Sequence, residues 1–332
     1  MNQKLTIAIP TYNRNKEIVN CINSLISQLT PECFLMIIDN HSDIPVETSL
    51  REVLIESKVE YKIFRNPVNV GLFANVMRCF EYCETSYLWI IGDDDLANFN
   101  AIKTIFSYLE NFPEFVLFNF STAMLKRAED THTKGLFDLL DNIDVVGNFG
   151  YLPASIYNVE KLRQNIRIGY HYTYSFYPHL ALLFYSLNDD SQCLISKEQI
   201  ALFTKYPTEE QRWSEIARNL GMPILLDIPN DYQAKQKLFE VINRGMSGYK
   251  SFAVALMERA IISGNKESAR YLYEQIVSRR IFFESRLYQK IAVKFYRLLF
   301  QLSPKLGVKL LKNEKYNSFA KKIATEDPTR RM

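Results

Sequence analysis

Short apolar runs alternate with helix-patterned segments over the first third of the chain, and this alternation constrains the fold most strongly. Buried strands are expected at residues 5–9, 34–38, 59–64 and 87–91, and Pro10 is expected to stop the first. The runs are continuously apolar, which is typical of parallel strands covered on both faces. The pattern predicts an α/β fold, a mostly parallel sheet with helices on both faces.

The segments between these runs carry helical spacing. Ile18, Ile22 and Leu25 fall on one helical face, and further helices are expected at residues 46–57 and 71–83 and beyond residue 100. From residue 116 to about 200 the pattern loosens, and its aromatic-rich part suits a substrate cleft. After about residue 210 the sequence is helical to its end, so the sheet domain is expected to be followed by a helical C-terminal region.

Three consecutive acids, Asp93, Asp94 and Asp95, follow the run at 87–91. Ligands of parallel sheets bind beyond the carboxyl ends of the strands. Adjacent carboxylates repel one another, and a divalent cation with oxygen ligands would remove that cost. A solvated turn or a helix start, both of which favour Asp, is the alternative. The position at a strand end favours a metal and phosphate site.

Composition indicates a globular protein kept inside the cell. The 332 residues are 47% apolar, enough for a large core, and no segment has the length and apolar character of a signal peptide or a membrane span. A cytoplasmic location is therefore expected. The five cysteines suit reduced, buried thiols. Cys79 and Cys83 have the spacing of a metal pair, but no second pair accompanies them, which favours core packing.

Positive charge is concentrated at the C-terminus, where residues 279–332 carry 14 Lys/Arg against 4 Asp/Glu. On a helix, four of these basic residues would form one row, and a row of apolar residues would lie beside it. This interfacial pattern predicts binding to an anionic membrane surface. The alternative is an ordinary helix packed on the catalytic domain with a solvated basic edge. A nucleic-acid binder is suggested only by this charge, and no specific nucleic acid is expected. The two rows are Arg286, Lys290, Lys294 and Arg297, and Phe283, Leu287, Ile291, Phe295, Leu298 and Leu299.

Four motifs in order resemble family-2 glycosyltransferases over residues 4–112, and more weakly to about residue 195. Two later segments, Phe149–Pro153 and Tyr177–His179, are similar to bacterial O-antigen and capsule sugar transferases of the abequosyltransferase type. The resemblance implies a GT-A (Rossmann-like) fold that binds a nucleotide-diphosphate sugar, with Mn²⁺ or Mg²⁺ on the diphosphate. The four motifs are Pro10–Arg14, the strand end at Asp39, the segment from Arg65 through Gly71 to Asn75, and Gly92–Asp95.

The resemblance also assigns the donor site. Thr11 and Tyr12 would hold the nucleoside, Asp39 would accept a hydrogen bond from the base, as uracil requires, and Arg65 would reach the base or the diphosphate. Each has a plain structural alternative, such as Asp39 capping the next helix. The expected nucleotide-sugar-binding residues are Pro10, Thr11, Tyr12, Asn13, Asp39, Arg65, Asn75, Asp93 and Asp94.

The metal motif departs from the family pattern, because Gly92 stands where an Asp is common. By that alignment Asp94 and Asp95 are the metal ligands, with Asp95 first. Relatives place a catalytic carboxylate where this chain has Pro178-His179. His179 is therefore the candidate general base for the acceptor hydroxyl, with a metal or phosphate ligand and a core residue as alternatives.

The resulting hypothesis is a metal-dependent inverting glycosyltransferase that moves a sugar, with UDP favoured, to a saccharide acceptor, lipid-linked, in O-antigen or capsule biosynthesis at the inner face of the cell membrane. The predicted domains are 1–205, with a nucleotide-sugar-binding half 1–112 and an acceptor-binding half 113–205, and a helical region 206–332. A nucleotidyltransferase-like enzyme is an alternative, although the basic Gly-rich loop typical of that class is missing after the first strand. The other alternative is a non-catalytic protein that binds a nucleotide sugar.

Overall fold

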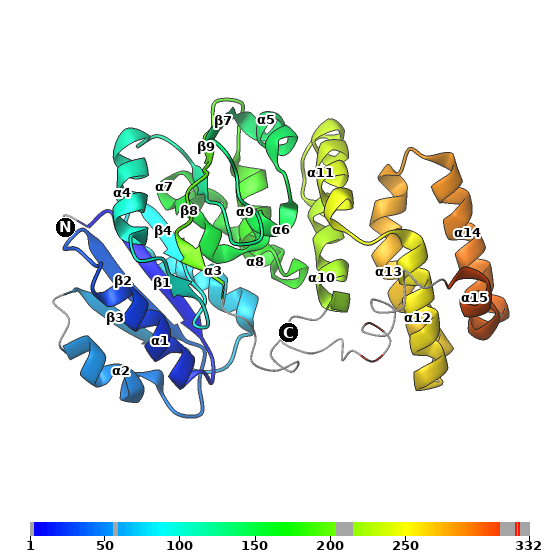
Figure 1. Ribbon diagram of the computed structural model, residues 1–332, viewed down its shortest axis with the longest axis horizontal. Helices are drawn as coiled ribbons and strands as arrows, with labels where there is room; N and C mark the ends of the chain where they lie inside the picture. Colours follow the sequence, from blue (N-terminus) through cyan, green and yellow to red (C-terminus); the bar gives the residue numbers. More distant parts are fainter. Residues whose placement is uncertain (1–2, 56–58, 204–214, 313–322, 324, 326–332) are drawn as a thin grey trace. The chain divides into compact units, whose positions relative to one another are not determined.

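The computed structural model describes residues 3–55, 59–203, 215–312, 323 and 325. The chain divides into two compact units, Met1–Pro207 and Thr208–Met332. The first contains a large sheet with its helices, and the second is helical among its described residues (Figure 1).

The first unit is built on an eight-stranded sheet of order β3-β2-β1-β4-β8-β6-β9-β7. Strands β1 to β4 are parallel, β6 and β9 run in the same direction, and β8 and β7 are antiparallel to their neighbours. The predicted mostly parallel sheet is confirmed. The strands are β1 (Leu5–Thr11), β2 (Cys33–Asp39), β3 (Tyr61–Arg65), β4 (Tyr87–Ile90), β6 (Leu117–Asn119), β7 (Thr131–Lys134), β8 (Ser155–Asn158) and β9 (Gln192–Ile195).

Pro10 does not end the first strand as the sequence predicted, because β1 continues to Thr11. Pairing between β1 and β4 stops at Ala8 and Ile90, while pairing with β2 continues to Thr11 and Asp39. Pro10 therefore lies beyond the last β1–β4 pair, where its missing amide hydrogen breaks no ladder bond.

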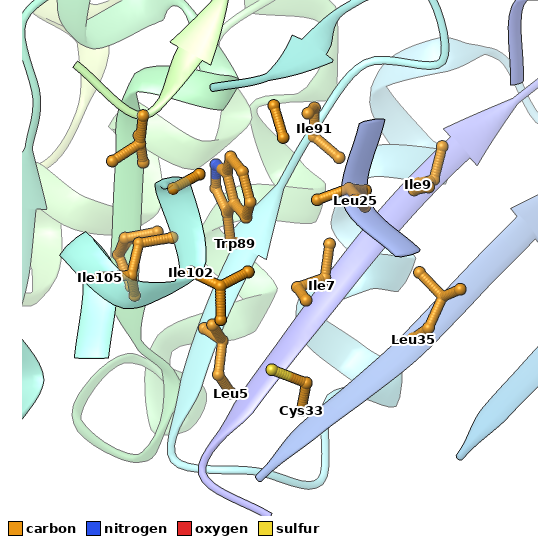
Figure 2. Packing of buried hydrophobic residues seen from close by; sticks show 14 of the residues in the cluster. Leu5, Ile7, Ile9, Leu25, Cys33, Leu35, Trp89, Ile91, Ile102 and Ile105 are labelled. Carbon is orange, nitrogen blue, oxygen red and sulfur yellow. The ribbon is translucent and has the colours of Figure 1, made fainter. Parts of the chain in front are cut away.

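Helices cover both faces of the parallel half. Helices α1, α2 and α4 bury their apolar faces against one side of β1, β2 and β4, and Figure 2 shows Leu25, Ile102 and Ile105 beside Leu5, Ile7 and Trp89. Helix α3 packs on the other side with α8 and α9. The helices of this unit are α1 (Asn15–Ile26), α2 (Val46–Ile55), α3 (Leu72–Tyr82), α4 (Ala101–Asn111), α5 (Gly135–Asn142), α6 (Val146–Gly150), α7 (Val159–Leu162), α8 (Ile166–His171) and α9 (Pro178–Ser186).

A second small sheet lies beside the acidic triplet. Strand β5 (Leu96–Ala97) follows Asp95 directly and pairs antiparallel with β10 (Ala201–Leu202). The amide of Ala97 donates to Ser24 Oγ at 2.9 Å, which joins β5 to α1. The chain that leaves the triplet is therefore fixed on two sides.

The second unit packs around α12, whose residues Phe252–Met257 are fully buried. Arg280 is buried with them, donating to Asn243 Oδ1 at 2.6 Å, with its guanidinium 4.4 Å from the ring centroid of Tyr249. The helices are α10 (Glu215–Gly221), α11 (Tyr232–Gly245), α12 (Tyr249–Ser263), α13 (Lys266–Phe283), α14 (Leu287–Leu302) and α15 (Pro304–Leu311), with a 3-10 helix at Met222–Asp227.

Two further expectations concern the cysteines and membrane spans. All five cysteines are buried and unpaired, as predicted for Cys79 and Cys83. Among the described helices, none combines the length and the apolar character needed to cross a bilayer.

Candidate functional site

The carboxyl ends of three adjacent strands place the predicted donor residues side by side. Thr11 pairs with Asp39 across β1 and β2, and Asp39 pairs with Arg65 across β2 and β3. On the other side of β1, the turn after β4 carries Asp93, whose carboxylate accepts a hydrogen bond from Thr11 Oγ1 at 2.8 Å. One sheet edge thus collects the residues of all four motifs.

Arg14 joins the acidic triplet to the loop after β1. Its guanidinium lies 2.9 Å from Asp93 Oδ1 and 2.6 Å from Asp94 Oδ2. Burial raises the pKa of Asp93 to about 6, although Arg14 and Thr11 favour its charged form. The bridge therefore offsets only part of the cost of holding these acids together.

Asp95 has a different partner and accepts a hydrogen bond from Tyr151 Oη at 2.7 Å. Burial, followed by the neighbouring Asp94, raises the pKa of Asp95 to about 7. Trp89 Nε1 donates to the Pro153 carbonyl at 2.9 Å, which holds the segment after Tyr151 against β4. Tyr151 is thus placed to orient the Asp95 carboxylate.

The carboxylate oxygens of the acidic triplet are ligands of the kind that a divalent cation prefers. Across the described ranges, no three His, Cys, Asp or Glu side chains converge as a finished metal site, and no basic group there forms an ion pair with Asp95. A buried carboxylate without a cationic partner is costly, and a bound cation would remove that cost. Asp94 and Asp95 supply oxygen ligands, and the phosphates of a donor would supply others.

The missing side chain of Gly92 provides the space that the carboxylates of Asp94 and Asp95 occupy. A Cβ at this position would lie 2.6 Å from Asp95 Oδ2 and 3.1 Å from Asp94 Oδ1. Any larger residue here would therefore displace the next two carboxylates from these positions.

Gly92→Ala should accordingly displace Asp95 and lower kcat/KM by about tenfold or more, the scale for a misplaced catalytic group. Gly248→Ala is the matched control, because no atom lies within 4 Å of a Cβ there. Steady-state kinetics of the two variants checks this, and equal activity in both would contradict the assigned role of Gly92.

Asp39 is more constrained than the sequence indicated. Its buried carboxylate accepts from the Ser42 amide at 2.8 Å, from the Val46 amide at 3.4 Å, and from Arg65. Arg65 also donates to the Ser42 carbonyl at 2.7 Å. The capping alternative is thus present at Asp39, and Arg65 is the more exposed partner of the pair.

The loop after β1 is anchored to the loop after β2. Asn13 adopts a left-handed conformation with φ 53°, which Asn tolerates better than most residues. Its amide donates to Ser42 Oγ at 2.9 Å, and its side chain exchanges hydrogen bonds with Asp43. This leaves Tyr12 42% exposed at the sheet edge, where a base or ribose can stack on it.

Asn75 is buried beneath the edge rather than on its surface. Its Nδ2 donates to the Ile38 carbonyl at 3.0 Å, and its Oδ1 accepts from Asn66 at 2.9 Å. Asn66 donates in turn to Asn40 Oδ1 at 2.8 Å. These contacts favour a role for Asn75 in positioning the loops after β2 and β3.

His179 lies in the first turn of α9 and is 1% exposed. Its ring is 6.4 Å from Tyr157 and 6.3 Å from Tyr177, centroid to centroid. Burial lowers its pKa to about 3, although the backbone of Phe149 and Gly150 favours the charged form. A base for an acceptor hydroxyl needs access and a pKa nearer neutrality, so the structure favours the core-residue interpretation.

Two residues of the site carried no assigned role in the sequence analysis. Arg14 and Tyr151 both lie within segments that show the family resemblance, but their partners are 79 and 56 positions away. Only the fold brings them to the triplet.

Sequence comparison shows the family to which this sheet edge belongs. A profile of glycosyl transferase family 2 matches residues 6–183, which is more than half of the chain. The chain belongs to glycosyltransferase family 2. Comparison with curated proteins found no match.

Solved structures share the fold of this glycosyltransferase. S. aureus TarS 1-349 in complex with UDP-GlcNAc is 16% identical, with a TM-score of 0.57, covering 90% of this chain and 92% of that one. Another structure of S. aureus TarS has a TM-score of 0.59 at 15% identity and covers 90% of this chain and 55% of that one. The mannosyltransferase PcManGT from Pyrobaculum calidifontis, with GDP-Man and Mn²⁺, is 10% identical, with a TM-score of 0.51 and coverage of 97% and 84%. The predicted GT-A fold is thereby confirmed.

Asp95 should also make stability depend on pH. Its folded pKa of about 7 exceeds the ordinary value of 3.8, so its contribution is full below about pH 4 and is lost as pH rises through 7. In a metal-chelating buffer, Asp95→Asn should match the parent near pH 4 and exceed it near pH 8 by on the order of 4 kcal/mol. Denaturant unfolding at both pH values checks this, and a difference that does not change with pH would contradict it.

Proposed function

We propose that this family-2 glycosyltransferase is a metal-dependent inverting enzyme that uses a nucleotide-diphosphate sugar and a saccharide acceptor. The observation that carries the proposal is the sheet edge where Thr11, Asp39 and Arg65 stand in register beside the buried acids of the β4 turn. Such an edge is where open α/β sheets bind nucleotides.

The donor would lie across the ends of β1, β2 and β3. Tyr12 would stack on the nucleoside, and the exposed side of Arg65 would meet the base or the diphosphate. UDP is the favoured nucleotide, because Asp39 can accept from a uracil N–H if Arg65 moves. One similar structure is a complex with UDP-GlcNAc and another with GDP-Man, so both nucleotides belong in the test.

Mn²⁺ or Mg²⁺ would be held by Asp94 and Asp95 and would stabilise the departing diphosphate as a Lewis acid. Tyr151 orients Asp95, and Thr11 and Arg14 hold Asp93 beside them. In the mannosyltransferase structure Mn²⁺ accompanies GDP-Man.

The acceptor is proposed to be a lipid-linked saccharide of a bacterial surface polysaccharide, O-antigen or capsule. The support is the similarity of Phe149–Pro153 and Tyr177–His179 to transferases of the abequosyltransferase type. Tyr151 lies in the first of these segments and touches the acid cluster, which places that segment next to the proposed donor site.

Release of nucleoside diphosphate tests the proposal. The parent protein should hydrolyse at least one member of a panel of UDP-, GDP-, CDP- and dTDP-sugars with Mn²⁺, and a saccharide acceptor should accelerate it. Asp95→Asn is the control, because it keeps the shape and the Tyr151 contact but removes the charge. A panel that is bound but never cleaved would favour the non-catalytic alternative.

A further inference from the structure

Helix α14 exposes a row of large apolar side chains that are not part of the core formed by the described residues. Its members are spaced three or four residues apart, which puts them on one face. Their exposed fractions run from 44% to 70%. The row consists of Leu287, Ile291, Phe295, Leu298 and Leu302, with Tyr288 beside it and Leu306 and Leu310 exposed in the same way on α15.

A different face of α14 holds the second unit together. Val293, Tyr296, Leu299 and Phe300 are buried in the core around α12. The helix is therefore stabilised by packing of this face, and the exposed row lies outside that core. Contiguous apolar surface of this size on a folded unit usually marks a contact surface.

Positive charge borders the exposed row. Lys290, Lys294 and Arg297 follow one another along one edge of α14, and Lys305 and Lys309 stand beside the apolar pair of α15. No Asp or Glu occurs from residue 287 to residue 312. Arg297 lies 2.8 Å from Glu274 of α13, so its charge is partly offset and the lysines supply most of the positive charge of the border. An apolar face with a largely cationic border is the pattern of helices that lie in a membrane interface.

We infer that the α14–α15 surface, defined as the eight exposed apolar residues and their five bordering cations, binds an anionic lipid bilayer. Apolar side chains would enter the acyl boundary while Lys294, Lys305 and Lys309 meet lipid phosphates. A second copy of the chain is a poorer occupant, because self-association would bring two cationic borders together.

The structure changes the membership of the surface expected from sequence. Leu299 is buried, and Phe283 packs with Tyr232 at 5.7 Å between ring centroids, so neither is available. Leu302, Leu306 and Leu310 extend the row instead. One face of α14 packs within the second unit, in the core around α12, and another face remains exposed. The inference does not depend on the proposed sugar transfer.

Liposome sedimentation of the full chain tests the surface. The parent should bind vesicles containing phosphatidylglycerol, bind pure phosphatidylcholine vesicles at least about tenfold more weakly, and lose affinity as salt rises. Serine at Leu287, Ile291 and Leu302 should lower the partition coefficient about tenfold or more without lowering the melting temperature. The matched control places serine at Phe99, Met124 and Ile262, which are exposed elsewhere.

Charge-reversal variants measure the electrostatic contribution to vesicle binding separately from the apolar one. Lys294→Glu with Lys305→Glu should weaken binding about tenfold or more, while Lys103→Glu with Lys126→Glu changes the net charge equally and should not. Equal partitioning of the parent and the serine variant would overturn the inference. Concentration-dependent dimers lost in the serine variant, with no vesicle binding by the parent, would assign the surface to a second copy and also overturn it.

Discussion

Asp95→Ala should remove sugar transfer almost completely, lowering kcat/KM by about a thousandfold, the scale for losing a principal electrostatic contact to the developing charge. The carboxylate is buried beside Asp94 with a pKa raised to about 7, so it costs folding free energy rather than supplying it. The variant should therefore fold at least as well as the parent. Calorimetry should show that UDP or GDP affinity rises with Mn²⁺ in the parent and is independent of Mn²⁺ in the variant.

Two comparisons make this result specific. Asp94→Ala should show a similar loss, whereas Tyr151→Phe should show a smaller one, because it removes only the hydrogen bond that orients Asp95. Transfer activity retained in Asp95→Ala with unchanged metal dependence would contradict the assignment of the metal ligands.

His179→Ala should destabilise the protein by about 2 kcal/mol, the scale for truncating a buried side chain, and should leave turnover per folded molecule nearly unchanged. The ring is 1% exposed and its pKa is lowered to about 3, so it is uncharged near neutral pH and a weak base. Thermal melts and kcat measured on the folded fraction check this prediction.

His179→Leu is the matched control, since it keeps most of the buried volume and should restore stability. A general base would behave differently, with kcat reduced about a hundredfold in both variants and donor affinity unchanged. That outcome would reinstate the catalytic interpretation and contradict the packing role.

The centre of the sheet edge was predictable because β1 and β2 are long and almost continuously apolar. Strand β2 has seven residues and β1 has seven, and each ends at a polar residue of the donor site, Thr11 and Asp39. The prediction that Pro10 ends β1 was wrong, because proline ends a strand only where its missing amide hydrogen removes a ladder bond. Its position beyond the last β1–β4 pair depends on neighbours that no local pattern shows.

The second half of the sheet was harder to predict from sequence because its strands are short. Strand β6 has three residues, and β8 and β9 have four each, too few for a periodic pattern to separate strand from helix. Contacts such as Arg14 with Asp93 and Tyr151 with Asp95 join distant segments. The same holds for His179, whose residue type suited a base but whose burial is set by the surrounding helices.

Hydrogen–deuterium exchange with and without a nucleoside diphosphate and Mn²⁺ tests the central claim, that the donor binds at the carboxyl edge of β1, β2 and β4. Exchange should slow in three separate loops, at residues 11–15, 39–43 and 91–96, in the parent protein with Mn²⁺, and in Asp95→Ala this protection should no longer depend on Mn²⁺. Saturating nucleotide that protects other segments and leaves these three loops unchanged would contradict the account.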